Sequence, residues 1–221
     1  MLQFERQAWD RGICRLAGVD EAGRGPLAGP VVAAAIVFDK PFLEAEQYGC
    51  LKSVNDSKRL TPRERDRLFT VLTETCPCVY GVGIANVAEI DALNILRATH
   101  LAMARALDAV SPLPDFILVD GLPVPNFPCP SRSIIRGDSL SLSIAAASII
   151  AKVSRDRMMA VLDQQYPQYV FSQHKGYGTR IHMKALLDYG PCPAHRRSFR
   201  PVQEMLRLHG RRVDSALEGG L

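Results

Sequence analysis

The chain has 221 residues, of which 47% are hydrophobic and 23% are charged, and its formal net charge is +4. This composition is typical of one globular domain with a substantial core and excludes a disordered chain. The longest apolar run, residues 31–38, is far shorter than the ~20 residues of a membrane-spanning helix. Residues 1–12 mix charged and polar side chains, unlike a secretory signal, so we expect a cytoplasmic protein without a membrane partner.

The positive charge is concentrated near the C-terminus. Residues 1–170 carry 18 basic and 19 acidic side chains, whereas residues 171–221 carry 9 and 4. A basic C-terminal quarter suits a polyanion such as nucleic acid, although a solvated arginine-rich tail has the same composition. The six cysteines lack the C-x-x-C spacing and nearby histidine pair of a zinc site, so we expect reduced thiols.

Strands and helices alternate from the start of the chain. Residues 15–20 form a short apolar strand, and residues 30–38 form a strand that is apolar on both faces and therefore central. The polar, punctuated stretch 39–58 is predicted to be a loop. A helix begins at the motif TPRE, where Thr61 is the N-cap and Glu64 completes a capping box.

The alternation continues in the second half. Residues 79–87 form a strand whose glycines indicate that another element packs closely against it. An amphipathic helix over 88–110 is followed by strands at 115–121 and 131–137 and by a helix over 138–165.

Beyond these elements lie a loop, HKGYGT, an arginine-rich stretch, short helices and a tail, 209–221, that is expected to fray. The pattern predicts an α/β fold with a mixed central sheet flanked by helices and a small helical C-terminal appendage. We divide it into a core, residues 1–165, and a basic helical segment, residues 166–221.

Glycines follow the first predicted strand at a spacing that invites a cofactor interpretation. Gly23, Gly25 and Gly29 form G-x-G-x-x-x-G, one residue longer than the dinucleotide fingerprint. A strand follows them, so no helix N-terminus is available for a pyrophosphate. The spacing therefore disfavours a nucleotide-dependent oxidoreductase.

Four acidic residues occupy the ends of predicted elements: Asp20, Glu21, Asp120 and Asp138. Each alone has an ordinary explanation as a turn, a helix cap or a solvated charge. Together they would meet at the edge of the sheet where ligands bind in α/β folds, and they would repel one another unless a cation neutralised them.

Oxygen ligands of this kind suit Mg²⁺ or Mn²⁺, and two such ions clamp the attacking and leaving oxygens of a phosphodiester. The pattern therefore predicts a two-metal nuclease. Neighbours on a regular strand point to opposite faces, so Asp20 and Glu21 can share the site only if the chain bends there.

The motif GVDEAGRGPLAGPVV, residues 18–32, closely resembles the opening motif of type 2 ribonuclease H (ribonuclease HII). The resemblance continues in the family's order through NDSKRL, ILVDG, IRGDSLSLSIAAASIIAKVSRD, HKGYGT and HRRSF, over about residues 16–200. Type 3 enzymes are less similar, because they carry a lysine where Arg24 stands and an extra N-terminal domain for which the first strand begins too early.

The resemblance implies a ribonuclease H-like fold and assigns roles to particular positions. The family's four acidic positions, which hold metal, fall on Asp20, Glu21, Asp120 and Asp138. Its glycine-arginine-glycine element falls on Gly23, Arg24 and Gly25, where backbone groups approach the 2′-hydroxyl that distinguishes RNA from DNA. Its tyrosine falls on Tyr177, beside the sugar at the RNA–DNA junction. Lys58 is expected to contact a phosphate of the substrate. Further contacts with the sugar–phosphate backbone of the nucleic acid are expected from Lys175, Arg180, Arg196 and Arg197.

The implied activity is metal-dependent hydrolysis on the 5′ side of ribonucleotides in RNA–DNA hybrids and in DNA with embedded ribonucleotides. The products would be 3′-hydroxyl and 5′-phosphate ends, and the role would be removal of ribonucleotides from DNA. The alternative is a non-catalytic hybrid-binding module of the same fold. We expect a monomer, and the sequence leaves open which ion is preferred, whether single ribonucleotides are favoured over long hybrids, and any protein partner.

Overall fold

The computed structural model describes residues 1–45 and 49–218, with side-chain detail to residue 209. Its strands form one mixed sheet in the order β3-β2-β1-β4-β5. Strand β1 is parallel to β4 and antiparallel to β2, so the first strand of the chain is also the middle one. The strand bounds are β1 Leu16–Ala22, β2 Val31–Phe38, β3 Cys78–Ala85, β4 Phe116–Asp120 and β5 Ser131–Ile134.

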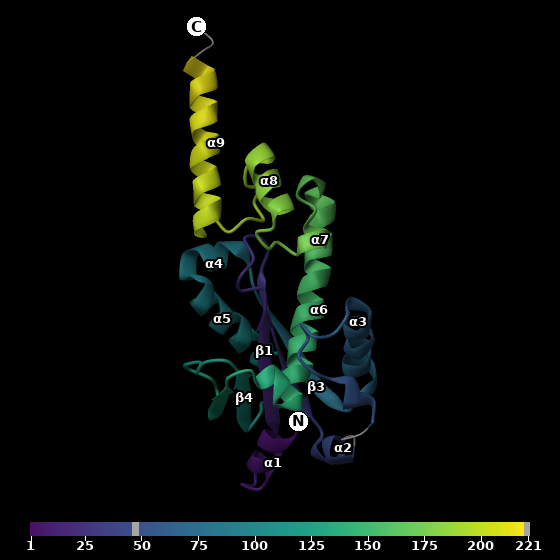
Figure 1. Ribbon diagram of the computed structural model, residues 1–221. Helices are drawn as coiled ribbons and strands as arrows, with labels where there is room; N and C mark the ends of the chain where they lie inside the picture. The colour runs from purple at the N-terminus through teal and green to yellow at the C-terminus, as the bar shows by residue number, and fades with distance from the viewer. Residues whose placement is uncertain (46–48, 219–221) are drawn as a thin grey trace.

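Helices lie on both faces of this sheet and continue beyond it (Figure 1). Their bounds are α1 Gln3–Trp9, α2 Lys40–Ala45, α3 Pro62–Thr70, α4 Val87–Leu93, α5 Ile95–Asp108, α6 Leu142–Gln165, α7 Phe171–His174, α8 Arg180–Tyr189 and α9 Arg200–Glu218. Short 3₁₀ or π turns occupy Cys50–Ser53, Val71–Thr75, Gly137–Ser139 and Pro167–Tyr169. Among the described residues, no helix is both long enough and apolar enough to cross a membrane.

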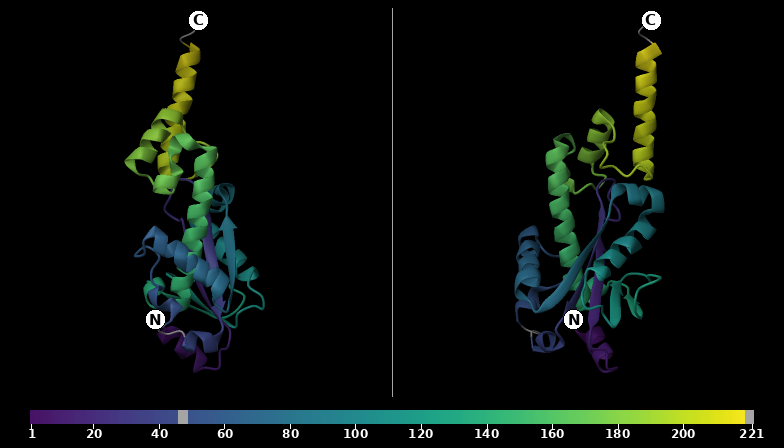
Figure 2. Two further views of the ribbon diagram at one scale, coloured as in Figure 1. Left: turned by 90° about the vertical axis from the view of Figure 1, so that its right-hand side faces the viewer. Right: turned by 180° about the vertical axis from the view of Figure 1, so that it is seen from behind.

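The centre of the sheet is buried because each face has its own helical cover (Figure 2). Alternate residues of β2, such as Ala34 and Ile36, pack with α6 on one face, while Ala33 and Ala35 pack with α5 on the other. Every residue of β2 is buried, which confirms that this apolar strand is internal. The mixed sheet with helices on both sides confirms the predicted fold class.

The glycines of β3 confirm the expected close packing. A Cβ on Gly81 would lie 2.1 Å from the carbonyl oxygen of Ala106, and one on Gly83 would lie 2.0 Å from that of Ala102. Helix α5 therefore rests directly on the backbone of β3. The capping box at Thr61 and Glu64 is also present at the start of α3.

Residues beyond α6 pack against the glycine-rich loop that follows β1. A hydrophobic cluster joins Leu27 and Ala28 of that loop to Met159 of α6 and to Phe171 and Leu186 of the C-terminal part. Ala28 also forms an isolated β-bridge with His195. The C-terminal part is thus packed against the loop between β1 and β2, and α9 projects beyond it (Figure 1).

Four local expectations differ from the structure. The stretch 39–58 contains α2 and a 3₁₀ turn rather than only loop, and the helix expected over 88–110 is divided at Asn94, whose φ is 70°. The helix expected from Asp138 begins at Leu142, because Ser141 caps it and Asp138 lies in the preceding 3₁₀ turn. The tail expected to fray is helical to Glu218, and its last three residues lie outside the described part.

Candidate active site

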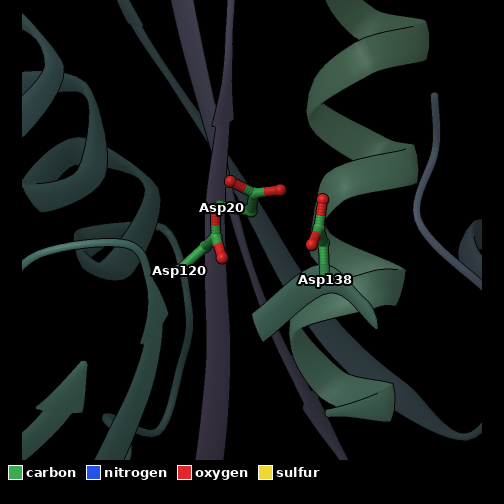
Figure 3. A group of neighbouring side chains, drawn as sticks. All are labelled: Asp20, Asp120 and Asp138. Atoms are coloured by element: carbon green, nitrogen blue, oxygen red, sulfur yellow. The ribbon is translucent and has the colours of Figure 1, made fainter. Parts of the chain in front are cut away.

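Three aspartates from separate segments meet at one edge of the sheet. Val19 and Val119 are paired in the parallel strands β1 and β4, and each is followed by an aspartate, so Asp20 and Asp120 leave the sheet at the same edge. Asp138 lies in the turn before α6. In the same turn, the Gly137 N–H donates a hydrogen bond to Asp120 Oδ1 at 2.6 Å. One carboxylate oxygen from each aspartate lies within 4.8 Å of the others. Figure 3 shows the three carboxylates turned toward a common space.

The electrostatics of this aspartate cluster favour a bound cation. Asp20 is only 5% exposed. Burial raises the pKa of Asp20 well above its ordinary value, and the surrounding carboxylates raise it further. Burial and the neighbouring Asp120 also raise the pKa of Asp138. Hard divalent ions take oxygen ligands in this arrangement, so the donor set fits Mg²⁺ or Mn²⁺.

Lys58 is the cation that the structure places on the cluster. Its Nζ lies 3.7 Å from Asp138 Oδ2, and its side chain is 79% exposed. Although burial opposes the change, Asp138, Asp20 and other carboxylates raise the pKa of Lys58. An ion pair this exposed neutralises little of the buried charge. Lys58 therefore lies over the cluster on its solvent-exposed side.

Glu21 lies beside the cluster and contacts a different partner. Strand β1 stays in regular register with β2 through Ala22. The chain therefore lacks the bend that would turn the side chains of Asp20 and Glu21 to the same face. The Glu21 carboxylate accepts a hydrogen bond from Arg24 at 3.1 Å. Burial raises the pKa of Glu21, whereas Arg24 opposes the rise. The aspartates therefore converge in this structure, and Glu21 is held at their margin by Arg24.

The loop between β1 and β2 rests on two buried arginines that sequence reasoning did not identify as supports. Arg155 is 1% exposed and Arg196 is 0% exposed. Both guanidinium groups donate to backbone carbonyls rather than to carboxylates, and they hold the oxygens of Gly23, Arg24, Ala28, Gly29, Pro30 and Lys175 at 2.6–3.2 Å. We call Arg155 and Arg196 the buried arginine pair. The expectation that Arg196 contacts nucleic acid is wrong, because its guanidinium is buried and donates its hydrogen bonds to backbone carbonyls inside the protein.

The two glycines that flank Arg24 differ in what surrounds them. Gly23 has a φ of +98°, and a Cβ there would lie 2.0 Å from Arg155 Nε, so the fold itself requires glycine. A Cβ on Gly25 would meet only the ring of Tyr177, at an ordinary 3.5 Å. Nothing in the fold demands glycine at Gly25, and the space it leaves open lies next to an exposed aromatic ring.

Tyr177 belongs to the loop between α7 and α8, and its side chain is 47% exposed. It lines one cavity of about 460 Å³ together with Asp20, Glu21, the Gly23–Gly25 segment and Lys58. Residues from distant parts of the sequence therefore share a pocket with carboxylates on one side and an aromatic ring on the other. Of the other basic residues, Arg180 and Arg197 are exposed and Lys175 is half-buried.

A larger cavity of about 650 Å³ lies on the other side of Gly29 and Pro30. Its lining is apolar, with residues such as Ile84, Val161 and Leu162, and Tyr166 is its one titratable side chain. Among the described residues that line it there is no carboxylate, histidine or lysine, so the polar cavity around Asp20 is the candidate active site.

Comparisons with known proteins agree with this site. Residues 17–202 match the family model described as ribonuclease HII. The chain is 52% identical to the ribonuclease HII of Geobacillus kaustophilus over 207 residues, covering 94% of this chain and 76% of the relative. It is 49% identical to that of Chlamydia caviae over 204 residues, 92% of each chain.

A solved structure gives the same answer at the level of the fold. The crystal structure of the ribonuclease H2 from Pyrococcus horikoshii matches with a TM-score of 0.70 and 30% sequence identity, covering 86% of this chain and 96% of that chain. Family model, relatives and fold agree over nearly the whole length. The chain belongs to the ribonuclease HII family, and its activity is that of a ribonuclease H endonuclease.

Proposed function

We propose that this protein hydrolyses the phosphodiester bond on the 5′ side of ribonucleotides, both in RNA–DNA hybrids and in DNA with embedded ribonucleotides. The products are 3′-hydroxyl and 5′-phosphate ends, and the role is ribonucleotide removal from DNA. The observation that carries the proposal is the aspartate cluster, whose Asp20 lines the same cavity as Gly25 and Tyr177.

The aspartate cluster is proposed to hold two Mg²⁺ or Mn²⁺ ions. Glu21, which lines the same cavity although its carboxylate is paired with Arg24 in this structure, is proposed to complete the ligand set. Support comes from the convergence of three carboxylates within 4.8 Å and from the raised pKa of Asp20, which burial and its neighbours cause. When bound, the ions would supply positive charge that stabilises the attacking and leaving oxygens of an in-line displacement. Beyond the effect of burial, Asp120 and Asp138 both raise the pKa of Asp20, so we assign Asp20 the position shared by the two ions.

The other side of the cavity is proposed to recognise the ribonucleotide. Backbone groups of Gly23, Arg24 and Gly25 read the 2′-hydroxyl, since only glycine at Gly25 leaves room for a sugar beside the Tyr177 ring. Tyr177 packs against the sugar at the RNA–DNA junction, and Lys58 contacts a phosphate. These roles need both the core and the segment 166–221, which contributes Tyr177 and completes the groove.

The test uses a DNA duplex with one embedded ribonucleotide, incubated with and without Mg²⁺ or Mn²⁺. The expected product is a metal-dependent nick on the 5′ side of the ribonucleotide, while an all-DNA duplex stays intact. A folded protein that binds the duplex but nicks it with neither ion would leave the hybrid-binding module as the function. The variant Tyr177→Ala should act more weakly on the single ribonucleotide, and unchanged rates would remove Tyr177 from the proposal.

Two narrower expectations complete the proposal. We propose that the protein acts as a monomer, which light scattering of the purified protein tests directly. We also propose a reducing, cytoplasmic environment, because the spacing of the six cysteines favours reduced thiols over a zinc site.

A further inference from the structure

Three buried histidines lie beneath the loop that presents Tyr177. His174 ends α7, His182 lies in the first turns of α8, and His195 lies in the segment that pairs with Ala28. The rings of His174 and His182 stack with centroids 4.4 Å apart, and the Nε2 atoms of His182 and His195 are 2.9 Å apart. Among the described residues, none of these histidines contacts the aspartate cluster, so the proposed chemistry leaves them unexplained.

The hydrogen bonds around His182 and His195 fix which ring nitrogens carry protons. The backbone N–H of Cys192 donates to His195 Nδ1 at 3.0 Å, so that nitrogen must be an acceptor. The Cys192 carbonyl, 3.3 Å from the same nitrogen, is the poorer partner. A neutral His195 then carries its proton on Nε2 and donates to His182 Nε2. His182 consequently carries its proton on Nδ1 and donates to the carbonyl oxygen of Tyr177 at 2.9 Å.

Burial keeps both rings neutral, as this arrangement requires. Both side chains are 0% exposed. Burial lowers the pKa of His182 to about 4, and burial together with the His182 ring lowers the pKa of His195 to about 3. The relay therefore has a single direction: Cys192 N–H to His195, His195 to His182, and His182 to the Tyr177 carbonyl.

We propose that His182 and His195 are positioning residues, which act through the Tyr177 carbonyl to hold the Tyr177 ring against Gly25 for the ribonucleotide sugar. The inference rests on the proposed function, because it gives a reason for the ring to be held. Tyr177 is 47% exposed, so the conformation of its backbone contributes to the direction of its ring. We call His182 and His195 the histidine pair.

The loop around Tyr177 is fixed by backbone contacts at each residue. Gly176 O accepts from Leu27 N–H at 2.8 Å, and Gly176 has a φ of +84° that favours glycine. The Tyr177 N–H donates to His174 O at 2.9 Å, and Thr179 N–H donates to Tyr177 O at 2.8 Å. His182 supplies the second donor to that oxygen from the first turn of α8 rather than from the loop itself.

The experiment compares His182→Asn with His182→Leu in the full chain. The Asn side-chain amide occupies the place of the histidine Nδ1 and can donate to Tyr177 O, whereas leucine has the same shape without a donor. Both variants lose the contact with His195 equally, so they form a matched pair. The readout is the ratio of kcat/KM for a duplex with one embedded ribonucleotide to kcat/KM for a continuous RNA–DNA hybrid. Tyr177→Ala sets the value expected when the ring is lost.

We expect His182→Leu to lower this ratio about tenfold toward the value of Tyr177→Ala, and His182→Asn to keep it within about twofold of the wild type. Equal ratios in the two variants, whether both are kept or both are lost, would overturn the positioning role. A wild type that nicks neither substrate would instead overturn the proposed function, and with it the reason for this role.

A second measurement needs no variant. Two-bond nitrogen–proton correlation spectra of ¹⁵N-histidine-labelled protein report which ring nitrogen is protonated. We expect His182 protonated at Nδ1 and His195 protonated at Nε2 near neutral pH. The opposite tautomer at His182 would overturn the proposal even if both variants failed to fold.

Discussion

The aspartate cluster and the buried arginine pair both contain buried charged groups, and they differ in what surrounds those charges. The aspartates face one another, and their nearest cation is Lys58, whose side chain is 79% exposed. The arginines face backbone carbonyls, and each guanidinium has at least three acceptors within 3.2 Å. Burial lowers the pKa of Arg155 to about 10 and that of Arg196 to about 9, so both remain charged at neutral pH.

This difference distinguishes the candidate metal site, formed by the aspartates, from the arginines that support the loop beside it. A cluster of like charges without an internal counter-charge is satisfied only by something added from outside, which is how a metal site is recognised. A charge that donates several hydrogen bonds to backbone carbonyls is held by the protein itself, so it stabilises the loop that carries Gly23 and Gly25. Variants on the two sides should therefore separate activity from stability.

The largest effect is expected from Asp20→Asn. Loss of a charged ligand removes several kcal/mol of transition-state stabilisation, so nicking should fall roughly a thousandfold while substrate binding is largely kept. In metal-free buffer the variant should melt above the wild type, because a buried repulsion is gone. Saturating Mg²⁺ at about 100 times its Kd should stabilise the wild type by about 2.7 kcal/mol and the variant by much less. Nicking kinetics and thermal melting measure both; a lower melting temperature without metal, or lost binding, would make Asp20 a structural acid.

On the other side of the comparison, Arg196→Met should lower the free energy of unfolding by about 3 kcal/mol, because it leaves buried carbonyls without donors. The exposed neighbour provides the control: Arg197→Met should change stability by less than about 0.5 kcal/mol. Urea unfolding measures both. If the two variants were equally stable, Arg196 would not support the loop. If Arg196→Met instead lost affinity for nucleic acid in a salt-dependent way, Arg196 would be a nucleic-acid contact after all.

Gly23 and Gly25 offer the same comparison between a residue needed for stability and one needed for activity, within three residues. Gly23→Ala should cost about 2 kcal/mol, since its φ of +98° and the Arg155 side chain leave no place for a methyl group. Gly25→Ala should fold with nearly wild-type stability but cut the single-ribonucleotide duplex more slowly. Thermal melting and nicking rates distinguish them. Full activity in Gly25→Ala would show that no substrate group needs the open space beside Tyr177.

The last effect concerns pH. The histidine pair has lowered pKa values in the folded state, about 4 and about 3, so the unfolded state takes up protons first as the pH falls below about 6.5. Stability from each histidine is therefore present near pH 7 and falls by on the order of 2 kcal/mol by pH 5. The raised pKa values of Asp20 and Asp138, which burial causes, have the opposite sign, so they add stability on acidification.

Comparison with His182→Asn isolates the histidine contribution, because the carboxylates are the same in both proteins. The groups packed on His182 and His195 are His174, Phe171, Tyr169 and Cys192. The excess stability of the wild type over the variant should shrink between pH 7 and pH 5 in urea unfolding. A constant difference would mean that His182 is already charged in the folded protein.

The amino-acid sequence by itself determined the α/β alternation, the internal apolar strand β2, the capping box at Thr61 and the presence of acids at the ends of strands. These features depend on local patterns: side-chain periodicity, glycine spacing and the preference of oxygen side chains for helix starts. The motifs also sufficed for the family. Boundaries that depend on one cap or one positive φ, such as Ser141 and Asn94, could not be read from periodicity.

Only the tertiary structure decided which charged residues are accessible and which are used internally. Arg196 and Arg197 are neighbours in an arginine-rich stretch, yet one is fully buried under the Gly23–Pro30 segment and the other is exposed. Glu21 and Asp20 are likewise adjacent, but the alternation of a regular strand turns one toward Arg24 and the other toward the aspartate cluster. The histidine pair is 13 residues apart in the sequence and 2.9 Å apart in space. Such pairings arise from contacts between distant segments, so no local pattern contains them.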